Sequence, residues 1–167
     1  MGNHRYRILL KWCLYSALFL LVLLLTTVVL GSRTFLGVKL SLVPVYVACV
    51  ACREGHEAGG FFALACALVW AMAGQSSGAV FMGLLPVAAV VAGFFCSTYL
   101  TRSLLPAMAG CLLALVLCEG GVYALRLYLG EPLPSSGLAL LGIQTGLSML
   151  PAPLFWWLCR LIGKAGG

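Results

Sequence analysis

No charged side chain occurs between Ala58 and Thr101, a stretch of 44 residues. One helix crosses the hydrocarbon core of a bilayer, which is about 30 Å thick, with about 20 apolar residues. The stretch is therefore long enough for two crossings. Near its middle it reads Gly74-Gln75-Ser76-Ser77-Gly78, which is the composition of a turn. This part of the chain predicts two membrane-spanning helices joined by a short hairpin.

The remainder of the chain has the same apolar character. Hydrophobic residues form 63% of the 167 positions and charged residues 8%, and the mean hydropathy is +1.10. Soluble domains carry about 25% charged residues. The chain has no Asp, four acidic residues and two His, which leaves few groups for acid–base catalysis or for binding a hard metal ion. We therefore expect an all-α, polytopic membrane protein with a single domain, no cofactor and no enzymatic activity.

Apolar segments separated by turn residues predict a bundle of six transmembrane helices. The expected spans are residues 8–30, 38–52, 58–74, 78–100, 104–129 and 137–162. The second is shorter than the others and contains Pro44. The first follows basic residues, as in a secretory signal peptide, but its apolar run exceeds the ~7–15 residues of such peptides. We expect it to be retained as a span.

Basic residues are distributed unequally between the two sides of this bundle. One side holds Arg5, Arg7, Lys11, Arg53, Arg102, Arg160 and Lys164. The other holds Arg33 and Lys39, with Arg126 nearer that side but inside a span. Because positively charged loops stay in the cytoplasm, we expect both termini to be cytoplasmic, together with the loops that carry Arg53 and Arg102. The net charge of +6 is spread over both ends and several loops, without the basic stripe of a nucleic-acid interface.

Seven of the eight cysteines fall inside predicted spans, where they behave as small hydrophobic residues, and the eighth, Cys52, is the last residue of one. Cys49 and Cys52 form a CxxC pair, one helical turn apart. No second pair and no suitably placed His completes a four-ligand metal set. We therefore expect the cysteines to serve packing rather than metal or redox chemistry, and we expect no metal site.

Small residues recur at four-residue spacing on three of the predicted spans. They are Gly59, Ala63, Ala67 and Ala71 on the third, Ala89 and Gly93 on the fourth, and Gly142 and Gly146 on the sixth. Such faces let helices approach closely in a membrane, either within one bundle or against another protein. The longest of them, on the third span, is the candidate helix-docking face.

Two ionisable residues, Glu119 and Arg126, lie inside the fifth predicted span. Ionisable groups at this depth are costly and usually face the protein interior or water. Seven residues at about 100° each return the two side chains to nearly the same face, and Tyr123 lies between them. The Tyr123 hydroxyl is expected to bridge the pair. The patch either binds a ligand or partner, or fixes helix register inside the bundle.

A small-residue-rich segment, a Gly-containing hairpin and a Leu-rich helix follow one another in the centre of the chain. They read Gly59-Gly60-Phe61-Phe62, Ala67-Leu68-Val69-Trp70-Ala71-Met72-Ala73-Gly74, Ser77-Gly78 and Gly83-Leu84-Leu85. This order resembles the rod shape-determining protein MreD family, as do the turn at 99–105 and the polar-aromatic segment 119–128. The likeness covers most of residues 8–162. Where many members carry an acidic residue before the hairpin, this chain has Trp70.

The resemblance implies a non-enzymatic scaffold of the cell-elongation machinery in a bacterial inner membrane. Such a scaffold binds the bitopic protein MreC and helps to couple MreB filaments to the glycosyltransferase RodA and its transpeptidase partner. Function would then depend on docking through helix faces. Arg53 and Arg102 would face filaments or anionic lipid, or would only set the topology.

Two other classes of protein remain as alternatives. Substrate-binding subunits of energy-coupling-factor vitamin transporters are also small six-span proteins, and they dock through an Ala-rich face, here Ala63, Ala67 and Ala71. Their pocket needs convergent polar groups, and the outer loops offer few: Arg33, Thr34, Lys39, Gln75, Ser76 and Glu131. An intramembrane enzyme needs paired polar groups that face each other, which only the patch around Glu119 offers. The scaffold is the favoured interpretation.

Overall fold

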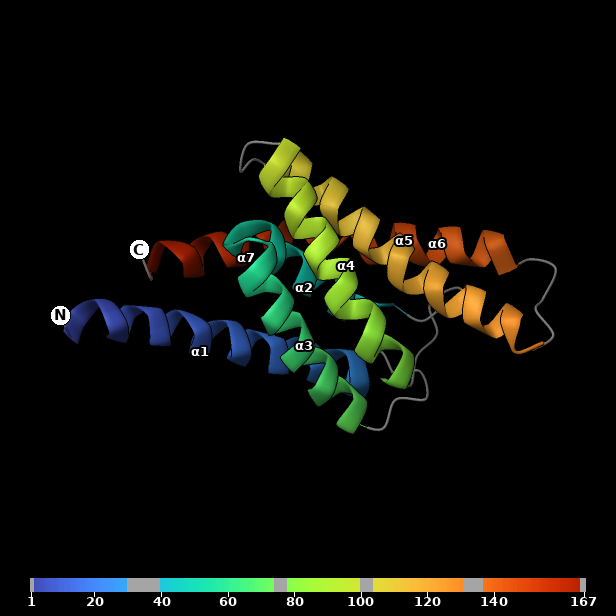
Figure 1. Cartoon of the computed structure of the whole chain (residues 1–167), viewed down its shortest axis with the longest axis horizontal. Coiled ribbons are helices and arrows are strands. Elements are labelled where there is room, and N and C mark those ends of the chain that lie inside the picture. The colour runs from blue at the N-terminus through green and yellow to red at the C-terminus, as the bar shows by residue number, and fades with distance from the viewer. Residues whose placement is uncertain (1, 30–39, 74–77, 100–103, 131–136, 166–167) are drawn as a thin grey trace.

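The structure of the chain, a computed structural model, describes residues 2–29, 40–73, 78–99, 104–130 and 137–165 (Figure 1). These residues are almost entirely helical and include no strand. The elements are α1 (Gly2–Leu24), a π-helical continuation η1 (Leu25–Val29), α2 (Leu42–Glu54), α3 (His56–Met72), α4 (Gly78–Tyr99), α5 (Leu104–Tyr128), α6 (Gly137–Met149) and α7 (Ala152–Ala165). The predicted all-α class is confirmed for this part of the chain.

Four helices within the described residues are long and apolar enough to cross a membrane. They are Arg5–Val28, Val80–Thr98, Leu104–Tyr128 and Ala139–Gly163. They correspond to the predicted spans 8–30, 78–100, 104–129 and 137–162. The last is interrupted at Leu150 and Pro151, between α6 and α7, because a proline ring clashes with the preceding helical turn and lacks the backbone donor.

The predicted spans 38–52 and 58–74 correspond to shorter helices. α2 has 13 residues and α3 has 17, which at 1.5 Å per residue gives lengths of about 20 Å and about 26 Å. Both are shorter than the hydrocarbon core of about 30 Å. The structure is therefore compatible with a helical membrane protein that has four long helices, and the count of six spans stays a prediction.

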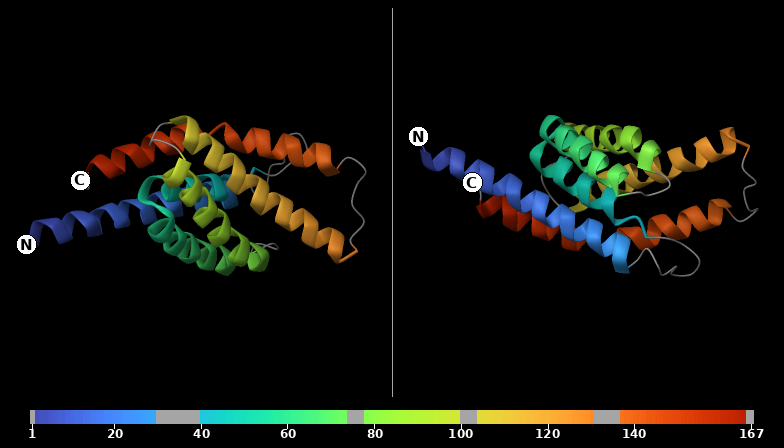
Figure 2. Two further views of the ribbon diagram at one scale, coloured as in Figure 1. Left: turned by 45° about the horizontal axis from the view of Figure 1, so that its top comes forward. Right: turned by 90° about the horizontal axis from the view of Figure 1, so that it is seen from below.

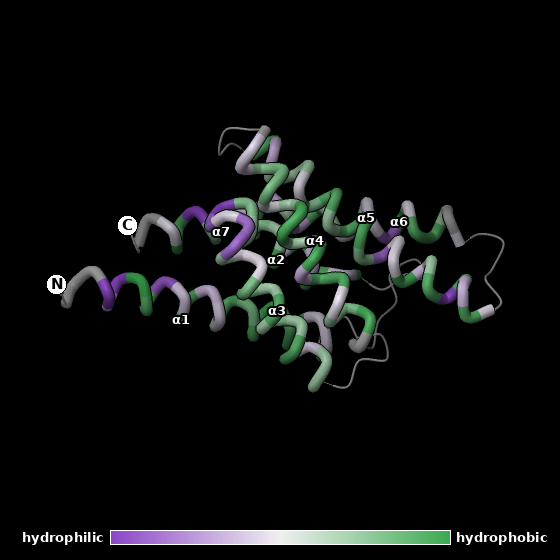
Figure 3. Tube along the Cα trace, viewed as in Figure 1, coloured by the Kyte–Doolittle hydropathy of each residue, from purple (hydrophilic) through white to green (hydrophobic). Residues whose placement is uncertain are grey.

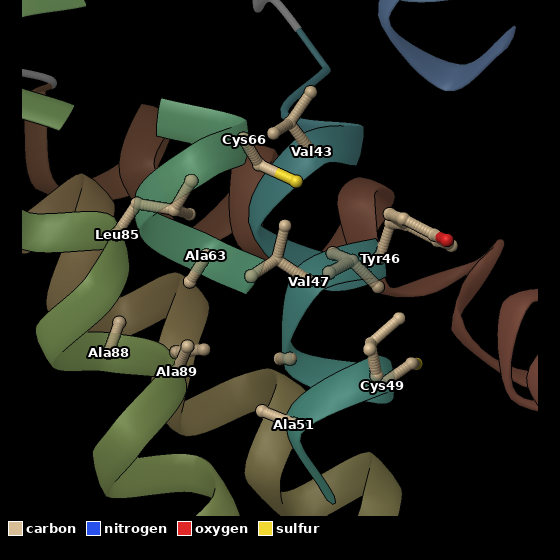
Figure 4. Packing of buried hydrophobic residues seen from close by; sticks show 14 of the residues in the cluster. Val43, Tyr46, Val47, Cys49, Ala51, Ala63, Cys66, Leu85, Ala88 and Ala89 are labelled. Atoms are coloured by element: carbon tan, nitrogen blue, oxygen red, sulfur yellow. The ribbon is translucent and has the colours of Figure 1, made fainter. Parts of the chain in front are cut away.

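α2 occupies the centre of the molecule. Ten consecutive residues, from Leu42 to Ala51, are buried, and the helix contacts α1, α3, α4, α5, α6 and α7. Figure 4 shows its Val43 and Val47 side chains toward Cys66 and Ala63 of α3, with Tyr46 on the opposite side of the helix, where its ring lies 5.8 Å from that of Phe155 on α7. A helix that is apolar on every face is suited to such an interior position. The neighbours that surround α2 explain why a helix too short to span the bilayer is stable here.

A one-residue connection, Gly55, reverses the chain between α2 and α3. Its φ of 99° and ψ of 166° define a conformation that is essentially restricted to glycine. The two helices then pack closely because Gly59 lacks a side chain: an added Cβ would lie 2.4 Å from the Cα of Ala51. Gly93 brings α4 against the same turn, where an added Cβ would lie 2.9 Å from the Cα of His56.

The first turns of α1 and the last turns of α7 lie at the same end of the molecule (Figures 1 and 2). Hydrophilic residues gather at this end and at the connection between α2 and α3 (Figure 3). The predicted cytoplasmic position of both termini requires such a common end. The bias of basic residues predicts that this end faces the cytoplasm. The cytoplasmic location of the termini stays a prediction.

Large hydrophobic side chains cover much of the outer surface. Exposed examples on five helices are Leu21, Leu24, Phe61, Val87, Phe94, Leu105, Leu127 and Leu154. Soluble monomers rarely expose contiguous apolar area of this extent, and larger patches mark contact with a membrane or another protein. The distribution of apolar residues, inside and outside, suggests a chain embedded in lipid.

Replacing Gly59 with Ala places a methyl group against the backbone of α2, 2.4 Å from the Cα of Ala51. Overpacking of this kind costs about 1–3 kcal/mol, and we expect the free energy of unfolding in detergent to fall by that amount. Gly83→Ala is the matched control, because nothing lies within 4 Å of its added Cβ. Equal thermal midpoints for the two variants would contradict the close contact between α2 and α3.

Candidate functional site

Two clusters of polar side chains lie at the two ends of the buried helix α2. The Ser41 cluster, at its N-terminal end, consists of Ser41, Glu119, Gln144 and Ser148. The Glu54 cluster, at its C-terminal end, consists of Lys11, Tyr15 and Glu54. Each cluster joins helices that are distant in the sequence. Together they place the ionisable groups Glu119, Lys11 and Glu54 at the ends of the apolar core.

The Ser41 cluster connects α2 to α5 and α6. The hydroxyl of Ser41 donates a hydrogen bond to the carboxylate of Glu119, and its backbone N–H donates to Oγ of Ser148 at 3.1 Å. Nε2 of Gln144 donates to the Ser41 hydroxyl at 3.4 Å. The carboxylate thus lies beside the N-terminus of α2, where the positive end of the helix dipole favours a negative group.

The predicted polar patch on α5 is divided in the structure. Glu119 is half-buried and points to Ser41, whereas Arg126 is exposed and its charge acts on the Glu119 carboxylate. Tyr123 packs against the start of α6, where a Cβ added to Gly137 would lie 3.1 Å from the Tyr123 hydroxyl oxygen. The patch is extended by Ser41, Gln144 and Ser148, which sequence reasoning missed. The four-residue spacing of Gln144 and Ser148, which places both on one face of α6, was the signal that could have found them.

The Glu54 cluster connects α1 to the C-terminal end of α2. Lys11 donates to one carboxylate oxygen of Glu54 and forms an ion pair with it, and the Tyr15 hydroxyl donates to the other oxygen at 2.9 Å. The backbone carbonyl of Tyr15 accepts a hydrogen bond from Tyr46, in the middle of α2, at 2.8 Å. From the sequence, Lys11 was placed only among the basic residues of one side of the bundle, so this pair was missed. Lys11 and Glu54 lie 43 positions apart, and no local pattern links them.

Arg53 and Arg102 were both predicted to lie in cytoplasmic loops. Arg53 lies in the last turn of α2 and is half-buried. Its Nη2 is 3.5 Å from the carbonyl of Arg160 on α7, to which it donates, and its guanidinium occupies the space where Gly163 lacks a side chain. Arg53 therefore connects α2 to α7. Arg102 lies outside the described residues.

The small-residue faces differ in what covers them. On α3, Gly59, Ala63 and Ala67 are buried, and Ala71 is half-buried, so the candidate docking face packs within the bundle, against α2 and α4. On α6, Gly142 and Gly146 are exposed, and a Cβ added to either would meet no atom of the described residues within 4 Å. Among the three predicted small-residue faces, in the part of the chain that the structure describes, the one on α6 is therefore open.

Trp70 is buried near the end of α3. It stands at the position where many members of the MreD family, which this chain resembles, carry an acidic residue. Its ring lies 4.5 Å from that of Phe81 on α4, between centroids, at an interplanar angle of 34°. Its indole N–H is buried and has no hydrogen-bond partner in the described part of the chain. The side chain packs α3 against α4 and supplies no charge.

The cysteines pair across helices rather than along the CxxC segment. Sγ of Cys49 lies 3.3 Å from that of Cys111 on α5, and Sγ of Cys52 lies 2.8 Å from that of Cys96 on α4. Among the described residues, no group of three or more His, Cys, Asp or Glu side chains could hold a metal ion.

Comparisons with family models, with curated proteins and with solved structures find no match to this chain. Its function is therefore proposed below from its residues and their geometry.

The pair Lys11–Glu54 is expected to couple α1 to α2 energetically. The two side chains are only 21% and 13% exposed, so removing one partner by Lys11→Met or Glu54→Gln leaves a poorly solvated polar group. We expect both single variants to be less stable and the double variant to recover part of the loss, with a coupling energy of about 0.5–3 kcal/mol. The free energies of unfolding of the wild type, the two single variants and the double variant, measured in one detergent, give this coupling energy. Glu57→Gln is the control, because Glu57 is an exposed carboxylate on α3. Strictly additive effects would exclude the pair.

Proposed function

We propose that this chain is a non-enzymatic scaffold of the cell-elongation machinery, embedded as a multi-pass protein in a bacterial inner membrane. In this proposal it binds an MreC-like bitopic protein. Through that complex it links cytoplasmic MreB filaments to the glycosyltransferase RodA and its transpeptidase partner during peptidoglycan synthesis. The resemblance in the centre of the chain supports the proposal, and so does an apolar bundle with few groups for catalysis.

The observation that carries the proposal is the open face of α6. Lipid is as apolar as leucine, so helices associate in a membrane through close backbone approach at small residues. Gly142 and Gly146 provide such an approach one turn apart, and internal packing leaves them uncovered. The single membrane-spanning helix of a bitopic partner fits this kind of face.

The basic end of the molecule supplies the second contact of the proposed scaffold. Arg5 on α1 and Arg160 on α7 are exposed there, and Arg160 lies over the ring of Trp156, 5.5 Å from its centroid. Exposed basic residues beside a membrane attract anionic lipid headgroups and acidic protein surfaces. This end is the part that would meet the filaments.

Closing the open face tests the scaffold proposal. We expect the double substitution Gly142→Leu with Gly146→Leu to abolish co-purification of the MreC-like protein encoded by the same genome, after both are expressed together and extracted in mild detergent. Gly83→Leu is the matched control, because Gly83 is an exposed glycine on α4 with equally open space around it. Retention of the partner by the double variant would reject the α6 face, and no complex with the unmodified chain would reject the scaffold itself.

The Ser41 cluster favours the second candidate, a substrate-binding subunit of an energy-coupling-factor vitamin transporter. Glu119, Gln144 and Ser41 are polar groups that converge from three segments, as a small-molecule site requires. A transporter subunit would retain a vitamin through purification and lose it on Glu119→Gln but not on Glu57→Gln, as mass spectrometry of the extracted ligand would show. The scaffold proposal predicts that no vitamin is retained.

A further inference from the structure

Two thiols from different helices meet near the end of the bundle that carries Arg53. Cys52, near the C-terminus of α2, and Cys96, near the C-terminus of α4, have their sulfur atoms 2.8 Å apart. The two residues are 44 positions apart in the sequence. Each sulfur also lies near a backbone carbonyl, that of Ala92 for Cys52 at 3.6 Å and that of Pro106 for Cys96 at 3.3 Å.

Gly110 on α5 creates the space in which these two sulfur atoms meet. A Cβ added to Gly110 would lie 2.7 Å from Sγ of Cys52 and 3.0 Å from Sγ of Cys96. Both side chains therefore point to one spot on α5. A disulfide holds its sulfurs at about 2.05 Å, so closing the bond needs an approach of roughly 0.8 Å.

A second thiol pair lies deeper in the same core. Cys49, one turn before Cys52 on α2, has its sulfur 3.3 Å from that of Cys111 on α5. Cys49 and Cys111 are each only 1% exposed, whereas Cys96 is 7% exposed and Cys52 is half-buried. Thiol–disulfide exchange requires access of the attacking sulfur to the disulfide. The pair of Cys52 and Cys96 is therefore the more accessible of the two to thiol–disulfide exchange.

Against the purely packing role expected from the sequence, we propose that Cys52 and Cys96 form a redox-active dithiol that closes to an interhelical disulfide by exchange with a small disulfide of the glutathione class. The thiolate of Cys52 attacks one sulfur of that disulfide and displaces one thiolate, which gives a mixed disulfide. The sulfur of Cys96 then attacks Sγ of Cys52 and displaces the second thiolate. Two cysteine S–H bonds are replaced by one S–S bond, and the two protons and two electrons leave in two molecules of reduced glutathione.

The disulfide would attach α4 covalently to the central helix. Because α2 carries the Ser41 cluster and the Glu54 cluster at its ends, oxidation restrains the helix on which both depend. Reduction by excess glutathione reverses the step, since the exchange runs in either direction. The proposal is independent of the scaffold proposal and does not use the open face of α6.

The test uses the full chain in lipid nanodiscs, equilibrated with mixtures of oxidised and reduced glutathione. After acid quenching, alkylation in denaturant and digestion, mass spectrometry locates each disulfide. We expect the linked peptide of Cys52 and Cys96 to form in most molecules in the oxidising mixtures and to disappear in reduced glutathione. The thiols of Cys49, Cys111, Cys66 and Cys118 should remain alkylatable throughout.

Two variants check the assignment. Cys66→Ser removes a buried cysteine of α3 that lies outside both pairs and should leave the linked peptide unchanged, whereas Cys52→Ser should leave Cys96 as a free thiol. The proposal is overturned if Cys52 and Cys96 stay free in the most oxidising mixture. It is equally overturned if Cys52 accumulates only as its glutathione adduct, or if the linked peptide joins Cys49 to Cys111 instead.

Discussion

An apolar helix enclosed on every side needs polar partners at its ends, because neither lipid nor a dry core supplies water to its unpaired backbone groups. α2 is such a helix, buried from Leu42 to Ala51. At its N-terminal end the backbone N–H of Ser41 donates to Ser148, and Pro44 lacks one of the donors that would otherwise need a partner. At its C-terminal end Arg53 brings positive charge, which the helix dipole favours, and Lys11 compensates the charge of Glu54. The surrounding helices are arranged to provide these contacts.

The packing of the other helices against α2 also determines which helix faces stay exposed and can bind another protein. Gly59 and Gly93 let α3 and α4 approach its C-terminal end at backbone distance, and this uses the longest small-residue face of the chain inside the bundle. On α6, Gln144 and Ser148 form hydrogen bonds with Ser41 at the start of α2, whereas Gly142 and Gly146 lie on the outside. Internal packing and external docking thus use different small-residue faces, and the scaffold proposal depends on that division.

Sequence reasoning predicted the helical class and the four long apolar helices, because these depend on composition and local spacing. The roles of Glu119 and of the small-residue faces stay predictions. Sequence reasoning did not predict that the segment with Pro44 forms the centre of the bundle, since hydropathy does not distinguish an enclosed helix from one that faces lipid. It also missed the partners of Lys11, Ser41, Cys52 and Cys49, which lie 43 to 107 positions away. Such contacts arise only from the tertiary arrangement. The resemblance to the MreD family and the six-span topology remain predictions.

The most direct test of this account measures which helices contact lipid. Nitroxide-labelled lipids in nanodiscs broaden the nuclear magnetic resonance signals of nearby backbone amides without any change to the protein. The account predicts that the amides from Leu42 to Ala51 are the least broadened in the chain and that those of the exposed α1 residues Leu20, Leu21 and Leu24 are among the most broadened. Equal broadening of α2 and α1 would contradict a bundle built around an enclosed helix.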